Sequence, residues 1–123
     1  MPETRYTKDH EWVRLDGATA TVGITDHAQS QLGDLVFVEL PDPGRNVTAG
    51  EPCATVESVK AASDIFAPLA GRIAETNKAI VDEPALVNRN PMGEGWFFRL
   101  EGAGFDVSAL MDEAAYKAYL ETL

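Results

Sequence analysis

A single lysine, Lys60, stands between two short extended segments, Cys53–Val59 and Ala62–Ala67, so the sequence predicts that it lies at the tip of a β-hairpin. Lysine carries a primary amine on a flexible four-carbon stem, and a tight turn projects that amine clear of the backbone. An isolated lysine in a turn is most often a solvated surface group. The chemistry that this position could support is covalent modification of the amine by another enzyme.

The other reactive side chains do not form a familiar catalytic or metal site. The chain has two histidines and one cysteine, too few for a closed zinc site. The segment His10–Arg14 begins like a zinc-protease signature but has arginine where the second histidine is required. Ser30, Asp26 and His27 share one short helical segment in which adjacent positions do not face one another, so they form no hydrolase triad. No metal site is expected, and an independent enzyme is the least supported class.

The single cysteine and the net charge restrict the function further. Cys53 has no second thiol for an internal disulfide or for a redox cycle of its own, so any dithiol chemistry would have to come from an attached group. Ten basic against twenty acidic residues give a formal charge of −10. This charge disfavours binding to nucleic acid and to anionic membranes. Partners with basic docking surfaces are the expected ones.

Length and hydropathy predict one compact cytoplasmic domain. The 123 residues, of which 45% are hydrophobic, suit a single domain over 1–123, with a β core over about residues 6–101 and a helical region over about 106–123. The longest wholly aliphatic or aromatic run, Leu35–Val38, is far too short to cross a membrane. Residues 1–12 lack the apolar segment of a secretory signal.

Most of the chain has the pattern of short strands. Trp12–Leu15 and Ala18–Ile24 are joined by Asp-Gly, the strongest hairpin signal in the chain. The segment Asp34–Leu40 is so apolar that it is predicted to be a strand buried in the interior. Further strands are expected in segments bounded by glycine and proline: Cys53–Val59, Ala62–Ala67, Arg72–Asn77 and Trp96–Leu100.

Two helices are expected beside these strands. A short helix near residues 26–32 has Asp26 as its predicted N-cap and ends at Gly33. Near the C-terminus, apolar side chains follow helical spacing at Tyr116, Tyr119, Leu120 and Leu123. This spacing predicts an amphipathic helix packed on the β core. Many short strands with little room for crossover helices indicate a mainly β fold, an antiparallel sandwich or flattened barrel.

The segment Glu57–Asp64 resembles the lipoyl-attachment motif of glycine cleavage system H proteins, and the resemblance extends through roughly Tyr6–Leu100. The matching pieces occur in the family's order: His10–Val13, Val22–Gln29, Leu32–Asp34, Phe37–Pro41, Glu57–Ala61, and Leu86–Asn88 followed by Pro91 and Gly93–Trp96. Each piece alone is a weak signal, and their shared order around one lysine carries the assignment. The resemblance implies a lipoyl/biotinyl-type barrel-sandwich hybrid of short antiparallel strands.

The resemblance also implies a cofactor and a set of partners. Lipoic acid would be joined in amide linkage to Lys60, within an attachment motif that includes Glu57, Ser58, Val59 and Ala61. A pyridoxal-phosphate glycine decarboxylase would load an aminomethyl group onto this arm, a tetrahydrofolate-dependent aminomethyltransferase would unload it, and a dihydrolipoyl dehydrogenase would reoxidise it. A lipoyl-attachment enzyme is the fourth partner. The protein itself would be a carrier and no catalyst, and a monomer is the simplest state for docking several enzymes in turn.

Three further residues are implied by the resemblance. A loaded arm would fold back into a groove, because an aminomethyl thioether decays in water. Glu11, His27 and Asp64 match positions that approach the aminomethyl group in related H proteins. Carboxylates suit a cationic amine, and a histidine in the first turn of a helix tends to stay neutral and able to accept a hydrogen bond. Each of the three could instead be an ordinary surface or capping residue.

Other functions stay open from the sequence. The domain could relay lipoyl groups to other proteins or act as an unmodified adaptor. A biotin carrier is less favoured, because biotin sites usually flank the lysine with methionine, whereas Val59 and Ala61 flank Lys60. The mass of the group attached to Lys60 separates these alternatives.

Overall fold

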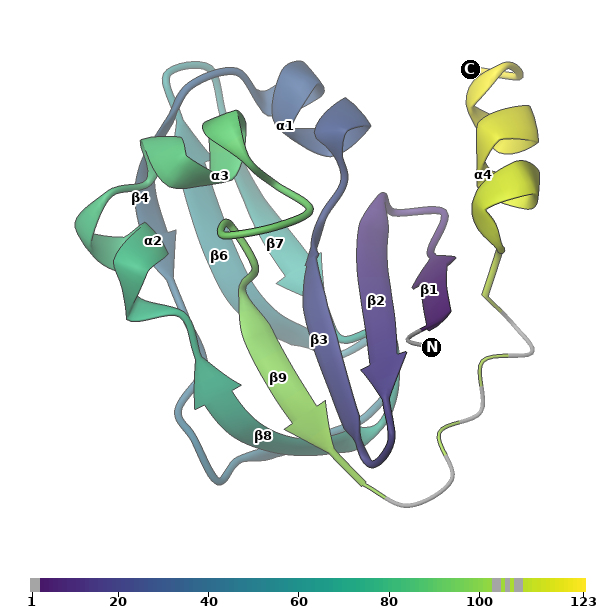
Figure 1. The fold of residues 1–123 in the computed structure, drawn as a ribbon. Helices are drawn as coiled ribbons and strands as arrows, with labels where there is room; N and C mark the ends of the chain where they lie inside the picture. The colour runs from purple at the N-terminus through teal and green to yellow at the C-terminus, as the bar shows by residue number, and fades with distance from the viewer. Residues whose placement is uncertain (1–2, 103–104, 106, 108–109) are drawn as a thin grey trace.

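The computed structural model describes residues 3–102, 105, 107 and 110–123. Figure 1 shows its elements, which follow one another as β1 (Glu3–Tyr6), β2 (Glu11–Asp16), β3 (Thr19–Ile24), α1 (Asp26–Leu32), β4 (Leu35–Glu39), β5 (Asn46–Val47), β6 (Pro52–Ser58), β7 (Ala62–Phe66), β8 (Gly71–Thr76), α2 (Lys78–Asp82), α3 (Ala85–Arg89), β9 (Phe98–Glu101) and α4 (Glu113–Leu120). The expectation of a mainly β fold with a short helix over 26–32 and a C-terminal helix is confirmed.

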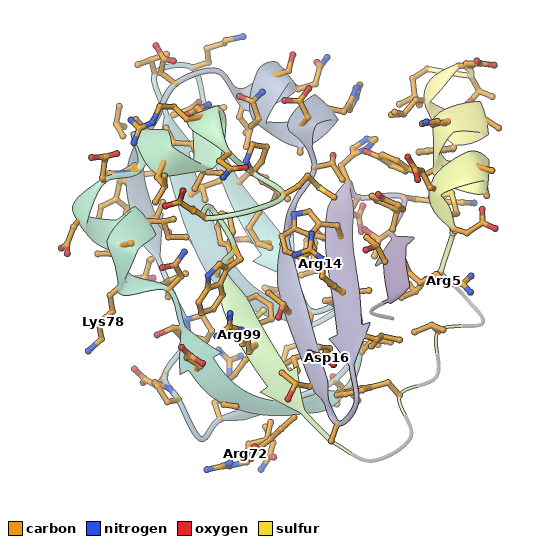
Figure 2. All side chains as sticks on the ribbon, viewed as in Figure 1. Arg5, Arg14, Asp16, Arg72, Lys78 and Arg99 are labelled. Carbon is orange, nitrogen blue, oxygen red and sulfur yellow. The ribbon has the colours of Figure 1, made fainter. Side chains whose placement is uncertain are left out.

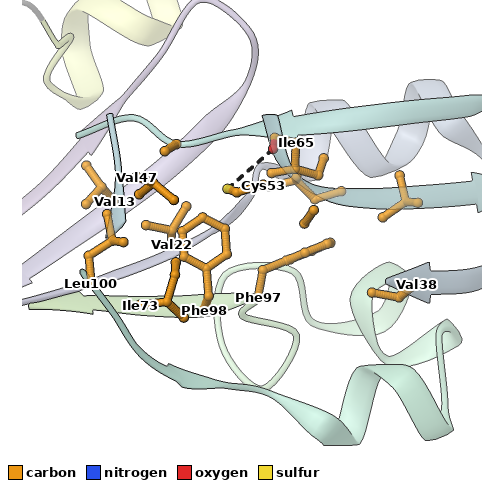
Figure 3. Packing of buried hydrophobic residues seen from close by; sticks show 14 of the residues in the cluster. Val13, Val22, Val38, Val47, Cys53, Ile65, Ile73, Phe97, Phe98 and Leu100 are labelled. Atoms are coloured by element: carbon orange, nitrogen blue, oxygen red, sulfur yellow. Dashed lines mark hydrogen bonds between the residues drawn. The ribbon is translucent and has the colours of Figure 1, made fainter. Parts of the chain in front are cut away.

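The described strands form two antiparallel sheets, one in the order β1-β2-β3-β9-β8-β5 and the other in the order β4-β6-β7. Side chains from both sheets fill the space between them, as the close view in Figure 3 shows. The buried residues labelled there are Val13, Val22, Val38, Val47, Cys53, Ile65, Ile73, Phe97, Phe98 and Leu100. Burying one large apolar side chain contributes about 1.5–3 kcal/mol, so this shared core holds the two sheets together.

The predicted hairpin of β2 and β3 is confirmed, but its turn is Gly17-Ala18, one residue later than the predicted Asp16-Gly17. Asp16 pairs with Thr19, and Gly17 between them has a φ of 65°, the left-handed conformation that this kind of two-residue turn requires. The indole of Trp12 covers Gly23 on the neighbouring strand, where a Cβ atom would lie 2.7 Å from the ring. The same indole donates a hydrogen bond to the carbonyl of Pro91 over 2.9 Å, which fastens the loop before β9 to the sheet.

The prediction that Asp34–Leu40 is an interior strand is wrong in its placement. The strand β4 exists, but it forms one edge of the three-stranded sheet, and its register with β6 shifts between Leu35 and Phe37. As a result Val36 is 59% exposed and Phe37 47% exposed. A run of apolar residues does not show which face of a strand is covered, because covering depends on neighbours that come from distant parts of the chain.

The helix α1 begins one residue earlier than its predicted cap. Thr25, not Asp26, is the N-cap: its hydroxyl oxygen accepts a hydrogen bond from the backbone N–H of Ala28 over 3.2 Å. Asp26 lies in the first turn, where its carboxylate accepts a hydrogen bond from the Gln29 side chain. The predicted end at Gly33 is confirmed, with a φ of 81°.

The C-terminal helix packs against β1 and not against the main core. The ring of Tyr116 stacks on Tyr6, with 4.6 Å between ring centroids, and both belong to a second cluster that contains Trp12. The Tyr116 hydroxyl lies 2.7 Å from Thr25 Oγ1 and 2.8 Å from His10 Nδ1. Leu123 lies beyond the helix and is 65% exposed, so the predicted apolar stripe ends at Leu120.

We expect Tyr116→Phe to destabilise the protein by about 1–2 kcal/mol, because it removes the hydroxyl that joins α4 to the N-cap of α1 and to His10. Burial, together with the charge of the neighbouring His27, lowers the pKa of His10 and so favours its neutral ring. Urea unfolding of the two proteins measures the effect. Tyr119→Phe, on the same helix, is the matched control, and equal losses in the two variants would contradict the assignment.

The sequence pattern did not reveal α2, α3, β1 or β5. Each of the two helices spans five residues and buries one side chain, Ile80 in α2 and Val87 in α3. A single buried residue produces no helical period, so tertiary packing defines these elements. No helix in the described part of the chain is both long and apolar enough to span a membrane.

Candidate functional site at the β6–β7 turn

Lys60 lies where the sequence predicts it, in the turn that joins β6 to β7. The two strands pair from Pro52 with Phe66 to Glu57 with Ala62, which leaves residues 58–61 as the tip. Lys60 and its neighbours Val59 and Ala61 are all exposed, and Glu57 is exposed beside them. Figure 1 shows the turn between β6 and β7 at one end of the smaller sheet. The primary amine of the exposed Lys60 therefore belongs to this end of the sheet.

Ser58 holds the turn in shape. Its hydroxyl oxygen accepts hydrogen bonds from the backbone N–H groups of Lys60, over 3.1 Å, and Ala61, over 3.0 Å. The same hydroxyl donates to the carbonyl of Ala61, which also accepts the backbone N–H of Ser58. Serine suits this position because its short polar side chain can satisfy backbone groups that a turn leaves unpaired. Ser58 thus fixes the backbone from which Lys60 projects.

We expect Ser58→Ala to reduce stability by about 0.5–1.5 kcal/mol, because two backbone donors at the turn lose their protein acceptor. The turn should also open, and amide hydrogen exchange at Lys60 and Ala61 should speed up. Ser63→Ala on β7 is the control, since the Ser63 hydroxyl makes a single long contact of 3.5 Å with the Asp64 carbonyl. Equal exchange rates in wild type and Ser58→Ala would show that this hydroxyl does not order the turn.

The segment after α1 supports the base of the turn. The backbone N–H of Val59 donates to the carbonyl of Asp34 over 3.1 Å, so the turn is tied to the link between α1 and β4. Asn88 in α3 holds the same link from its other side: its side-chain oxygen accepts the backbone N–H of Leu35, and its amide nitrogen donates to the carbonyl of Gly33. Three elements outside the hairpin therefore position Lys60.

Of the three predicted groove residues, Asp64 lies on β7 and Glu11 is hydrogen-bonded to the same strand. The carboxylate of Glu11 accepts hydrogen bonds from the Thr7 hydroxyl, over 2.9 Å, and from the backbone N–H of Phe66, over 3.3 Å. Asp64 lies two residues before Phe66 on the same strand and accepts a hydrogen bond from Thr55 on β6. Glu11 itself is only 2% exposed, whereas Asp64 is exposed.

Burial gives Glu11 unusual acid–base behaviour. Desolvation raises its pKa from the ordinary 4.5 to about 7, against the opposing effect of the hydrogen bonds from Thr7 and Phe66. A carboxyl with a pKa near 7 can be neutral or charged under physiological conditions. This burial is not visible in the sequence pattern, because Glu11 stands at the first position of its strand and is covered by β7, which lies far away in the chain.

His27 faces a different part of the molecule. Its ring lies 4.4 Å from that of His10, centroid to centroid. It lines a cavity of about 570 Å³ between α1, α4 and β1, together with Tyr6, Thr25, Asp26, Ser30, Met92, Glu113, Tyr116, Lys117 and Leu120. The predicted groove residues are thus divided between two places: Glu11 and Asp64 at β7, and His27 at the C-terminal helix.

The described residues contain no cluster of three or more histidine, cysteine, aspartate or glutamate side chains that could hold a metal ion. The remaining thiol is also unsuited to chemistry, because burial raises the pKa of Cys53 to about 12 and its Sγ lies 3.6 Å from the Ile65 carbonyl, its hydrogen-bond acceptor (Figure 3). A β domain that projects one lysine from an ordered turn, with its own thiol buried, has the character of a carrier of an attached group.

Comparison with known proteins identifies the kind of carrier. Residues 4–123 match the family model described as Glycine cleavage H-protein. The glycine cleavage system H protein of Acidiphilium cryptum is 61% identical over the whole of both chains, and that of Bradyrhizobium diazoefficiens is 57% identical over 97% of this chain and 98% of its own. A crystal structure of a glycine cleavage system H protein from Mycobacterium marinum superposes with a TM-score of 0.89 at 39% identity, covering 98% of each chain. The chain therefore belongs to the glycine cleavage H-protein family.

Proposed function

We propose that Lys60 carries lipoate in amide linkage and that the chain, as a single lipoyl-carrier domain over 1–123, serves the glycine cleavage system as its shuttle protein. Membership of the H-protein family supports the shuttle role. The observation that carries the attachment site is the exposed amine of Lys60 on a turn ordered by Ser58. Such an amine is open to a lipoyl-attachment enzyme without unfolding of the domain.

The chain's own residues fit this cofactor. Bound lipoate supplies a disulfide that can be opened, loaded and closed again. The buried Cys53, with its pKa raised to about 12, is held back from thiol–disulfide exchange with that group. Glu57, Val59 and Ala61 surround Lys60 without covering it, since all three are exposed. The domain therefore presents the attached group and leaves its chemistry to other enzymes, namely the glycine decarboxylase, the aminomethyltransferase and dihydrolipoyl dehydrogenase.

Charge favours partners with basic docking surfaces. The formal charge is −10, and several of the basic side chains are engaged within the domain. Figure 2 shows Arg14, Arg72 and Arg99 along the six-stranded sheet. Arg72 pairs with Glu101, Arg99 pairs with Glu75 over 2.8 Å, and Arg14 donates to the carbonyl of Met92. Uncompensated acidic side chains thus dominate the surface, which speeds encounters with basic partners at low salt.

The groove for the loaded arm remains part of this proposal. The hydrogen bond from the Phe66 N–H to Glu11 supports it, because it brings the buried carboxyl of Glu11 to the strand that carries the exposed carboxyl of Asp64, and carboxyl groups suit a cationic amine. His27 belongs to the cavity beside α4, and its role is the less supported of the three. If the arm loaded on Glu11→Gln decays in water at the wild-type rate, Glu11 has no part in shielding it.

Peptide mapping of the protein from lipoate-fed cells tests the attachment. We expect a lipoyl increment on the tryptic peptide that contains Lys60 and on no other peptide. A biotinyl increment there would replace the proposed cofactor. An unmodified Lys60, in cells that lipoylate another carrier, would overturn the proposal in favour of an adaptor, and transfer of labelled lipoyl from this chain to an acceptor domain would indicate a relay.

A further inference from the structure

The stem of Lys60 does not extend freely from the turn but rests on the backbone of Gly33. A Cβ atom added at Gly33 would lie 2.9 Å from Cε of Lys60, 3.7 Å from Nζ and 3.9 Å from Cδ. The far end of the lysine therefore occupies the volume in which any other residue at position 33 would place its side chain. Figure 1 shows the corresponding ribbons side by side, where the link from α1 to β4 passes the turn between β6 and β7.

Gly33 is distinguished from the other glycines with positive φ. Gly17, Gly44 and Gly50 have φ values of 65°, 93° and 85°, and a Cβ atom at each would meet nothing within 4 Å. Gly33 also has a positive φ, 81°, with a ψ of −162°, but it is covered by Lys60. Its left-handed φ explains why glycine ends α1, while the close approach of Lys60 is a second and separate constraint.

The support under Lys60 is itself fixed by hydrogen bonds. Asn88 donates its two amide hydrogens to the Gly33 carbonyl, over 2.9 Å, and to Gln29 Oε1, over 3.0 Å. Its oxygen accepts the backbone N–H of Leu35 over 2.9 Å. Together with the hydrogen bond from Val59 to Asp34, these contacts fix the position of the Gly33–Asp34 backbone next to the Lys60 side chain. We call this backbone the Lys60 platform.

We propose that Gly33 is a positioning residue for Lys60, and that Asn88 keeps the platform in place. Because Gly33 has no side chain, the Lys60 side chain can pack against its backbone. A group attached to Nζ would therefore extend from a position beside the end of α1. A lysine side chain packed against Gly33 has fewer conformers than one that extends freely into solvent, so the attached arm has a defined starting position and direction. The value of this origin to an arm rests on the proposed function, whereas the contact itself is present in the unmodified chain.

Methyl labelling of lysine amines tests the contact without any cofactor. Reductive methylation with ¹³C-formaldehyde places NMR probes on the lysines, including Lys60 and the exposed Lys78. In the wild type we expect an NOE between the Lys60 methyl groups and the Gly33 α protons, and slower local motion at Lys60 than at Lys78. In Gly33→Asn the motion of Lys60 should approach that of Lys78, because the added Cβ displaces the flexible end of the lysine. The backbone strain that any side chain meets at the Gly33 φ of 81° and ψ of −162° should appear separately, as a lower temperature of unfolding.

A matched control separates displacement of the lysine from general strain. Gly50→Asn places the same residue at a similar φ with open space around it, so Lys60 should move as in the wild type. Asn88→Asp keeps the acceptor for Leu35 and loses both amide donors, so it should free Lys60 in part, while Asn46→Asp on β5 should not. The variants are compared for thermal unfolding, so that a loss of fold is seen as such.

The outcomes distinguish this inference from the attachment proposal. Two results would overturn the proposed role of Gly33 even if Lys60 proves to be lipoylated. One is equal mobility of Lys60 and Lys78 in the wild type, and the other is a mobility of Lys60 in Gly33→Asn that equals its mobility in the wild type. The role of Gly33 would be established if Lys60 is less mobile than Lys78 in the wild type and becomes more mobile in Gly33→Asn but not in Gly50→Asn. That result would stand even if peptide mapping found no lipoyl group, in which case the attachment proposal alone would fail.

Discussion

Lys60→Arg should abolish lipoylation and reduce glycine cleavage, reconstituted with the partner enzymes, to the background without carrier. Arginine keeps the positive charge, but its guanidinium stays protonated and cannot act as the nucleophile that forms an amide. The other described lysines, such as the exposed Lys78, lie outside the Glu57–Ala61 motif, and the thiol of Cys53 is buried with its pKa raised to about 12, so none of these groups is expected to replace Lys60. Intact mass and evolution of carbon dioxide from glycine measure the two losses.

The loss should be chemical and not structural. Lys60 is exposed at a turn whose shape depends on Ser58, so the free energy of unfolding of Lys60→Arg should stay within about 0.5 kcal/mol of wild type. Lys78→Arg is the matched control: it makes the same substitution at another exposed lysine and should leave lipoylation and turnover unchanged. Glycine cleavage supported by Lys60→Arg would show that the arm is attached elsewhere.

Local signals were sufficient where a few neighbouring residues decide the conformation. Gly17 identifies the hairpin to within one residue because the two-residue turn needs a glycine with positive φ, and Gly33 marks the end of α1 for the same reason. Lys60 could be located because its flanking residues, Glu57–Ala61, carry the family's motif. These features do not depend on which strand packs against which.

The features that failed depend on distant contacts. The apolar run in β4 suggests an interior strand, yet Val36 and Phe37 are exposed, at the place where the register of β4 with β6 shifts. The contact between the Lys60 side chain and Gly33 joins residues 27 positions apart, and Asn88 in α3 donates a hydrogen bond to the carbonyl of Gly33. Nothing in the pattern of residues 78–90 shows that two short helices form there to place that asparagine. The motif thus locates the reactive amine, whereas the support around it is visible only in the fold.

Glu11→Gln should raise the stability of the protein at pH 8 by about 1–3 kcal/mol. The carboxyl of Glu11 is buried, and its pKa is raised from 4.5 to about 7 on folding. One pKa unit corresponds to about 1.4 kcal/mol, so the charged form costs the folded state about 3 kcal/mol. Glutamine keeps the shape without the charge. Its oxygen can accept the Phe66 N–H, and its amide can donate to the Thr7 hydroxyl.

The sign of the pH dependence follows from proton binding. Between pH 4.5 and about 7 the folded protein holds a proton on Glu11 that the unfolded chain has released, so this group's contribution to stability falls as the pH rises through that window. Below the window the contribution is complete, and above it the loss is complete. The difference between Glu11→Gln and wild type should therefore be small at pH 4.5, grow toward pH 7 and level off above it.

Urea unfolding at steps of 0.5 pH unit from pH 4.5 to 8.5 measures this difference in the free energy of unfolding. Because both proteins share the other carboxyl groups, the contributions of those groups cancel in the difference. Glu39→Gln, at an exposed position on β4, is the control and should differ from wild type by less than about 0.5 kcal/mol at every pH. A difference for Glu11→Gln that does not change with pH would mean that the folded and unfolded states bind this proton alike. Glu11 would then be an ordinary carboxylate that is charged in the folded protein. It would hold no proton that it could give to an amine.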